Sequence, residues 1–196
     1  MNLNSLFTKQ KQLDEHIVNE KGLHGQDLLK KKTVALLCEL YECVNCARFF
    51  KFWSENQEPN TLEIIECQFC DEGSIHNGKI ETETCIECGG EFITERKNPL
   101  LEEYADTIHL ALSIANDLGY TEHKYVHTEG TDLNDLVLGI TNIATIIPQS
   151  RETHHISTLI NNVIQLGYQL GFTEEDVLNA YDSKNKINYN RQKSGY

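Results

Sequence analysis

Two acidic pairs, each set in a helical apolar pattern, constrain the fold of this chain more than any other feature. One is Glu39-x-x-Glu42 and the other is Glu103-x-x-Asp106. Residues three apart lie on one face of an α-helix, so the two carboxylates of a pair share a face. The flanking apolar residues predict that each face lies at a seam between helices. They are Val34, Leu36, Leu37, Leu40 and Val44 around the first pair, and Tyr104, Ile108, Leu110 and Leu112 around the second.

Carboxylates that meet at a partly buried seam repel one another strongly unless a cation lies among them. Mg²⁺ prefers oxygen ligands, and proteins commonly bind it through carboxylates together with substrate phosphates. The two pairs therefore predict a Mg²⁺ site on facing helices that handles a phosphate-bearing substrate. The alternative is that both pairs lie on solvated helix faces.

Length and charge limit the remaining possibilities. A chain of 196 residues can form one hydrophobic core, or a core with a small appendage. The formal charge of −13 argues against nucleic acid or an anionic membrane as a partner. No run approaches the roughly 18 apolar residues of a membrane span, and the N-terminal stretch has no apolar core of a signal peptide. We therefore expect a cytoplasmic protein.

Four cysteines form two C-x-x-C pairs separated by fourteen residues; they are Cys67, Cys70, Cys85 and Cys88. This spacing is typical of a tetrahedral Zn²⁺ site. The segment from Ser54 to Arg96 holds eleven acidic and two basic residues, a net charge of −9. We expect a zinc ribbon with a structural role. Docking of a protein partner is the second interpretation.

The remaining pattern predicts an all-α helical bundle into which a small β-rich zinc ribbon is inserted. The catalytic domain would comprise residues 1–53 and 98–196, and the ribbon residues 54–97. Thr173 and Asp176 form a capping-box signature at the start of the last helix. The expected helices span residues 5–20, Asp27 to about Trp53, about 99–118, about 132–147 with an end at Pro148, about 153–171, and 173 to about 189.

Four blocks of the chain resemble the dimeric, all-α dUTPases of the MazG-like nucleoside-triphosphate pyrophosphatase superfamily, and most closely their phage and Gram-positive bacterial branch. The blocks are LFTKQKQLDEHI at 6–17, ELYECVNCARFFKFW at 39–53, LLEEYADTIHLALSIANDLGY at 100–120 and YDSKNKINYNRQKSGY at 181–196. The acidic pairs alone specify only the superfamily. The K-N-x-x-N-x-x-R-Q block and the F-K-F-W element indicate the dUTPase branch.

The resemblance implies hydrolysis of dUTP to dUMP and pyrophosphate by a homodimer, and leaves dUDP open as a second substrate. It implies that Glu39, Glu42, Glu103 and Asp106 hold Mg²⁺, and that one of the first pair, Glu39 by preference, orients the attacking water. The substrate-binding residues that it implies are Gln10 and Asp14 for the nucleoside, Lys51 and Trp53 for base and phosphate, His109 for the sugar, and Lys184, Asn188 and Arg191 for the phosphates.

The last of these groups also has a plain geometric property. Lys184, Asn188 and Arg191 lie at i, i+4 and i+7, which is one stripe of a helix and suits a polyphosphate. On spacing alone, a solvated C-terminal helix is the simpler interpretation. For His109 and Trp53, packing in the core or at an interface is an equally plain alternative.

The chain departs from the family pattern at two places. Cys46 occupies a position where related phage sequences usually carry a further acid, so any role of that acid is absent. The ribbon replaces a shorter connection. We expect Cys43 and Cys46 to be buried or half-buried thiols and Cys38 to lie in the core.

Three other functions remain open at this point. The same chemistry could act on dCTP or a damaged nucleotide, because phosphate-binding groups do not contact the base. A carboxylate-bridged di-iron site would need Glu-x-x-His motifs, and the chain offers Glu152-x-x-His155 and the related Asp106-x-x-His109. A non-catalytic protein could use the ribbon as its binding module.

Overall fold

The computed structural model describes residues 2–66 and 93–194, and the expectation of an all-α bundle is confirmed for them. The four cysteines expected to bind zinc lie outside this described part. The helices are α1 (Asn4–Lys21), α2 (Leu29–Ala47), α3 (Pro99–Asp117), α4 (Leu133–Ser150), α5 (Thr153–Gln169) and α6 (Glu174–Lys193); the strands are β1 (Glu63–Glu66) and β2 (Ile93–Lys97).

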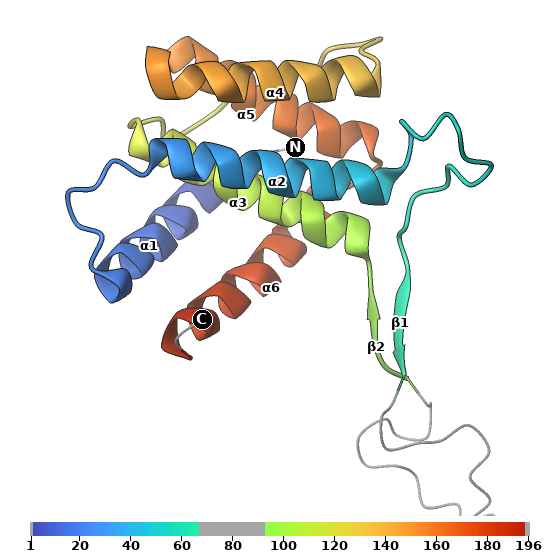
Figure 1. Cartoon of the computed structure of the whole chain (residues 1–196), viewed down its shortest axis with the longest axis horizontal. Coiled ribbons are helices and arrows are strands. Elements are labelled where there is room, and N and C mark those ends of the chain that lie inside the picture. Colours follow the sequence, from blue (N-terminus) through green and yellow to red (C-terminus); the bar gives the residue numbers. More distant parts are fainter. Residues whose placement is uncertain (1, 67–92, 195–196) are drawn as a thin grey trace, which may run out of the picture.

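Helix α3 forms the centre of the bundle and packs against α1, α2, α5 and α6 (Figure 1). Its start follows directly from the sequence. The Asn98 side chain accepts a hydrogen bond from the Leu101 backbone N–H, and Pro99 occupies the first helical turn, where its missing N–H costs nothing. Tyr104 and Ile108, which flank the acidic residues of α3, are fully buried, so α3 has little freedom to rotate.

Three helices end three or more residues away from the expected position. Helix α2 ends at Ala47 and not near Trp53, because Arg48 adopts a left-handed conformation with φ of 63°. Helix α4 continues through Pro148 to Ser150, since the proline lies in the last turns and removes only one hydrogen bond there. Helix α6 extends to Lys193. The capping box of Thr173 and Asp176 is confirmed.

The outward face of α2 corrects two expectations about the core. Cys38 is exposed, and Val34 is 62% exposed. The buried stripe of α2 instead follows Leu36, Leu40 and Cys43 toward α3, and residues 34 and 38 lie away from that stripe. Cys43 is buried and Cys46 half-buried, as expected.

Strands β1 and β2 pair antiparallel, with Glu63 opposite Lys97 and Glu66 opposite Ile93. The hairpin extends away from the helices (Figure 1). The connection between α2 and β1 is held at the end of α2. The Arg48 guanidinium donates two hydrogen bonds to the Asn56 carbonyl, and the Asn60 N–H donates to the Cys46 carbonyl. Within the described ranges 2–66 and 93–194, no helix combines the length and apolar character needed to cross a bilayer.

Candidate active site

Three carboxylates meet where α2 packs against α3. They belong to Glu39, Glu103 and Asp106, and one oxygen of each lies within 4.8 Å of the others. All three side chains are half-buried. Glu42, one turn farther along α2, is exposed and stands outside this group, but its charge still acts on the three carboxyls. The seam predicted from the two acidic pairs therefore exists.

The electrostatics of the cluster indicate a shortage of positive charge. Burial, followed by the charges of Asp106 and Glu42, raises the pKa of Glu39 to about 7. Burial also raises the pKa values of Glu103 and Asp106. A group of oxygen donors that resists ionisation without a cation fits Mg²⁺, which accepts carboxylate ligands and neutralises them. The donor set contains no nitrogen or sulfur, which softer metals would favour.

Lys184 is the cation that approaches the cluster. Its Nζ lies 2.6 Å from Oδ2 of Asp106, and the two side chains are only 17% and 21% exposed. Burial alone would lower the pKa of Lys184, but the hydrogen bond and charge of Asp106 raise it above its ordinary value. Lys184 is therefore charged at neutral pH and contacts a residue expected to bind metal.

A cavity of about 440 Å³ opens beside the carboxylates, between α1, α2, α3 and α6. It brings together most of the residues predicted for the site. Its lining includes Gln10, Asp14, Glu39, Asp106, His109, Asn188 and Arg191. Five described residues that were predicted for the site are not part of this lining: Glu42, Lys51, Trp53, Glu103 and Lys184. Trp53 is 65% exposed on the connection after α2.

A larger cavity of about 740 Å³ adjoins the first and lies between the C-terminal half of α1 and the α1–α2 connection. The two share Asp14 and Lys32 in their linings. Lys32 Nζ lies 2.7 Å from Oδ1 of Asp117 and 3.9 Å from Oδ2 of Asp14. The smaller cavity is the candidate substrate site, because only it contains members of the carboxylate cluster.

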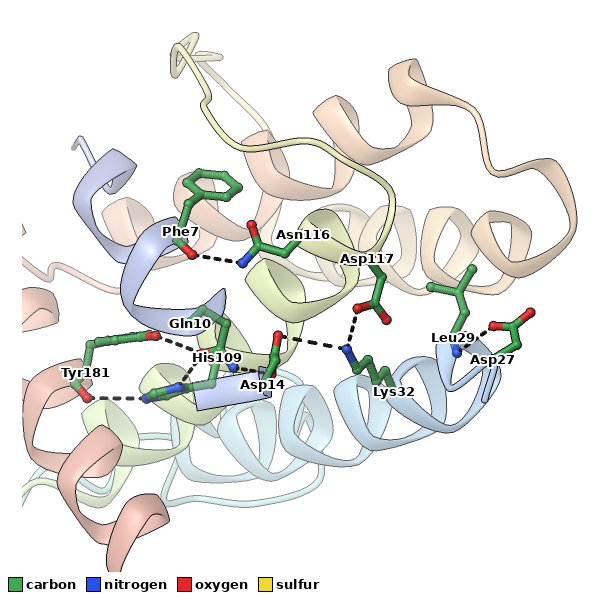
Figure 2. A network of polar contacts seen from close by, with 10 residues as sticks. All are labelled: Phe7, Gln10, Asp14, Asp27, Leu29, Lys32, His109, Asn116, Asp117 and Tyr181. Carbon is green, nitrogen blue, oxygen red and sulfur yellow. Dashed lines mark hydrogen bonds and ion pairs between the residues drawn. The ribbon is translucent and has the colours of Figure 1, made fainter. Parts of the chain in front are cut away.

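A hydrogen-bonded network joins side chains of α1, α3 and α6 beside the smaller cavity (Figure 2). Oε1 of Gln10 accepts hydrogen bonds from Nδ1 of His109 at 2.7 Å and from the Tyr181 hydroxyl at 2.8 Å. Nε2 of Gln10 donates to Oδ1 of Asp14 at 2.8 Å. Both polar ends of the Gln10 amide are therefore oriented by neighbours.

His109 is a neutral member of this network. Burial lowers its pKa to about 4, so only one ring nitrogen carries a proton at neutral pH. The shorter contact assigns that proton to Nδ1, which faces Gln10, while Nε2 lies 3.3 Å from the Tyr181 carbonyl. The ring stacks on Tyr181 with a centroid separation of 3.8 Å. Its position beside the cavity fits a role in positioning and not as a cation.

Tyr181 and Lys32 were not among the residues predicted for the site. Tyr181 is fully buried, and it reaches Gln10 from a position about two turns into α6. Tyr181 is the first residue of the C-terminal block whose cations are expected to bind phosphate. Its place in that block was the signal that the sequence offered for a role in the site. Lys32 carries no signal in the sequence, because its two acidic neighbours belong to α1 and α3.

The di-iron alternative has no support in the described part of the chain. Glu152, His154 and His155 form a separate group, largely exposed at the start of α5. His109 does not join Asp106 in the carboxylate group, and both of its ring nitrogens face Gln10 and Tyr181 instead.

The comparison with known families decides the identity of this site. The model of a family described as dUTPase matches residues 2–73 and 92–196. The chain belongs to the dUTPase family. It is a hydrolase of nucleotide metabolism that cleaves dUTP to dUMP and pyrophosphate, and membership of this family implies Mg²⁺ as the cofactor. The dUTPase match skips residues 74–91, which include the second C-x-x-C pair. No curated protein and no solved structure matches the chain.

Proposed function

We propose that Glu39, Glu103 and Asp106 hold the Mg²⁺ of this dUTPase, with Glu42 completing the acidic group from the exposed side. The supporting observation is the convergence of three half-buried carboxylates beside a cavity of about 440 Å³. Bound Mg²⁺ supplies positive charge that neutralises phosphate oxygens and lowers the pKa of water. The remaining chemistry belongs to the side chains of the protein.

Glu39 is the proposed base that orients the attacking water. Its carboxyl group belongs to the cluster and lines the cavity, so it can accept a proton from a water beside a bound phosphate. The carboxylate takes a proton from water as the water oxygen bonds to phosphorus. The bond between that phosphorus and the pyrophosphate leaving group breaks, which yields dUMP.

Lys184, Asn188 and Arg191 are the proposed ligands of the phosphate chain. They follow one stripe of α6, and the structure supports this assignment because Lys184 reaches the carboxylates while Asn188 and Arg191 line the cavity. Hydrolysis at phosphorus depends mainly on positioning and charge neutralisation. A stripe of two cations and an amide provides both.

Gln10, Asp14 and His109 are the proposed nucleoside-binding residues. Gln10 and Asp14 can present an amide and a carboxyl group to a base from one side of the cavity. Buried polar groups with fixed directions discriminate well between bases, because a wrong partner leaves them without hydrogen bonds. This arrangement supports selection of uracil over cytosine.

The test combines substrate range with a matched pair of variants. Pyrophosphate release should be faster with dUTP than with dATP, dCTP, dGTP or dTTP. Glu103→Gln should lower kcat for dUTP by more than about 100-fold, because loss of a residue that only orients a metal ligand already lowers activity by up to about 100-fold. Glu102→Gln, the neighbouring change outside the cluster, should retain activity. Equal rates for dUTP and dCTP would favour the alternative substrate, and an active Glu103→Gln enzyme would exclude this metal site.

We also propose that the enzyme is a homodimer and that Lys51 and Trp53 act within the assembly. Val34 on α2, Leu138 on α4 and Phe52 and Trp53 after α2 are 62%, 63%, 85% and 65% exposed. Large apolar side chains at such exposure favour coverage by a second copy. Light scattering coupled to size-exclusion chromatography tests this directly, since a monomeric mass would contradict it.

The insertion is proposed to be a structural zinc ribbon. The chain is proposed to belong to the phage and Gram-positive bacterial branch of the family. The support for the ribbon is the C-x-x-C spacing and the gap in the family match at residues 74–91. The net charge of −9 between Ser54 and Arg96 favours a protein over a nucleic acid as any further partner.

A further inference from the structure

The contact between Lys184 and Asp106 joins two groups of residues for which different functions are proposed. Lys184 belongs to the stripe of α6 that is proposed to bind phosphates, whereas Asp106 belongs to the carboxylate cluster. Their side-chain atoms nevertheless lie 2.6 Å apart, and both side chains are largely buried. At least one of the three N–H donors of this ammonium group is therefore directed at a proposed metal ligand, and Lys184 is not part of the cavity lining.

The charge of Lys184 acts on the whole cluster. It lowers the pKa values of Glu39, Glu103 and Asp106, in opposition to the effect of burial on each. Partly buried carboxylates are stabilised when a cation lies among them. The ammonium group therefore provides, in part, the neutralisation that a divalent ion would provide.

We propose that Lys184 is an internal counter-ion that competes with Mg²⁺ for the carboxylate cluster, so that metal and nucleotide bind cooperatively. In the nucleotide-free enzyme, the ammonium group pairs with Asp106. When Mg²⁺ binds, the like charge drives Lys184 away from Asp106 and frees it for the phosphates. This inference rests on the proposed metal site.

The geometry of α6 permits this exchange without movement of the helix. Asn188, one turn after Lys184, already lines the cavity. The lysine side chain has a flexible four-carbon stem with a compact ammonium group, so rotation about its side-chain bonds can redirect the charge. Each ligand thereby removes an obstacle to the other: the metal frees Lys184, and the phosphates hold Lys184 away from Asp106.

The experiment measures metal binding and does not depend on turnover. Mn²⁺ serves as the probe, because it shares the oxygen-ligand preference of Mg²⁺ and its free concentration can be followed by electron paramagnetic resonance. Without nucleotide, Lys184→Met should bind Mn²⁺ at least about tenfold more tightly than the wild type, as removal of a like charge a few ångströms away predicts. Lys186→Met, an equal change of charge at an exposed position of α6, should bind as the wild type does.

Addition of the non-hydrolysable analogue α,β-imido-dUTP completes the test. It should tighten Mn²⁺ binding strongly in the wild type and much less in Lys184→Met. Lys184→Arg, which keeps the charge, should retain weak metal binding without nucleotide, and this separates competition from a general role in packing. Circular dichroism confirms that each variant is folded.

The outcomes separate the inference from the metal site on which it rests. Equal Mn²⁺ affinities for wild type, Lys184→Met and Lys186→Met would overturn the counter-ion role alone, provided that Glu103→Gln still abolishes Mn²⁺ binding. If Glu103→Gln leaves Mn²⁺ binding unchanged, the metal site is wrong and the inference fails with it.

Discussion

Glu39 shows how one side chain connects stability with the chemistry of the site. Its pKa, raised to about 7 mainly by burial, exceeds the ordinary value of 4.5. The folded protein therefore binds more protons at this position than the unfolded chain between about pH 4.5 and 7. The contribution of Glu39 to the stability of the folded protein is therefore most favourable below this window and decreases as the pH rises through it.

We predict that Glu39→Gln removes this decrease in stability with rising pH. The measurement is the free energy of unfolding across pH 4.5 to 8 without added divalent cation, taken as the difference between wild type and variant. The difference is needed because His109, whose pKa is lowered to about 4, makes stability rise with pH over part of the same range. A difference that does not vary with pH would show that Glu39 titrates normally.

Tyr181 affects specificity through another residue. Its hydroxyl donates to Oε1 of Gln10 and helps to fix which end of that amide faces Asp14. We predict that Tyr181→Phe raises KM for dUTP and reduces discrimination against dCTP by roughly five-fold, the effect of one hydrogen bond of about 1 kcal/mol, with little change in kcat.

Tyr104→Phe provides the control for that variant. Tyr104 is also fully buried, and its hydroxyl donates to the Val163 carbonyl at 3.0 Å, away from Gln10. It should lose comparable stability and keep the preference for dUTP. If both variants change substrate discrimination equally, Tyr181 acts only through packing.

At the scale of elements, the close approach of α5 to α3 depends on a glycine. A Cβ atom at Gly167 would lie 2.1 Å from the hydroxyl oxygen and 2.3 Å from Cζ of Tyr104. We predict that Gly167→Ala lowers the free energy of unfolding by about 1–3 kcal/mol, because the ring of Tyr104 is buried and cannot move aside.

Gly139→Ala in α4 is the matched comparison. A Cβ atom there would lie 3.6 Å from Nδ2 of Asn162, which is an ordinary contact. Alanine also has the higher helix propensity, so this variant should gain about 0.5–1 kcal/mol. Urea denaturation of both variants measures the contrast. Similar effects at the two glycines would mean that α5 can shift away from α3.

The element boundaries show where local patterns are sufficient. The Thr173–Asp176 capping box marked a helix start correctly, because a cap involves residues only a few positions apart. The end of α2 was placed too late, since the aromatic residues after Ala47 continue an apolar pattern without continuing the helix. Burial on α2 also depended on which neighbour the helix meets, which left Cys38 exposed.

For the whole molecule, the hairpin predicts that the insertion can be removed. Glu66 and Ile93 are paired across β1 and β2, so a tight turn can join them. We predict that replacing residues 67–92 with Asn-Gly preserves helical content and dUTP hydrolysis and removes the zinc that the ribbon is proposed to bind. The measurements are circular dichroism, pyrophosphate release and metal analysis. Loss of hydrolysis in a folded variant would instead give the insertion a part in the reaction.

The sequence by itself determined which segments are helical, which faces carry acids, and which blocks belong to a dUTPase, because these properties follow from neighbouring residues and motif spacing. Only the tertiary structure decided that Glu39 joins Glu103 and Asp106 while Glu42 remains exposed. It also paired Lys184 with Asp106 and joined Gln10, His109 and Tyr181 from three helices. Helical periodicity gives the direction of a side chain about its own axis, but the distance between side chains on different helices is set by how the helices pack.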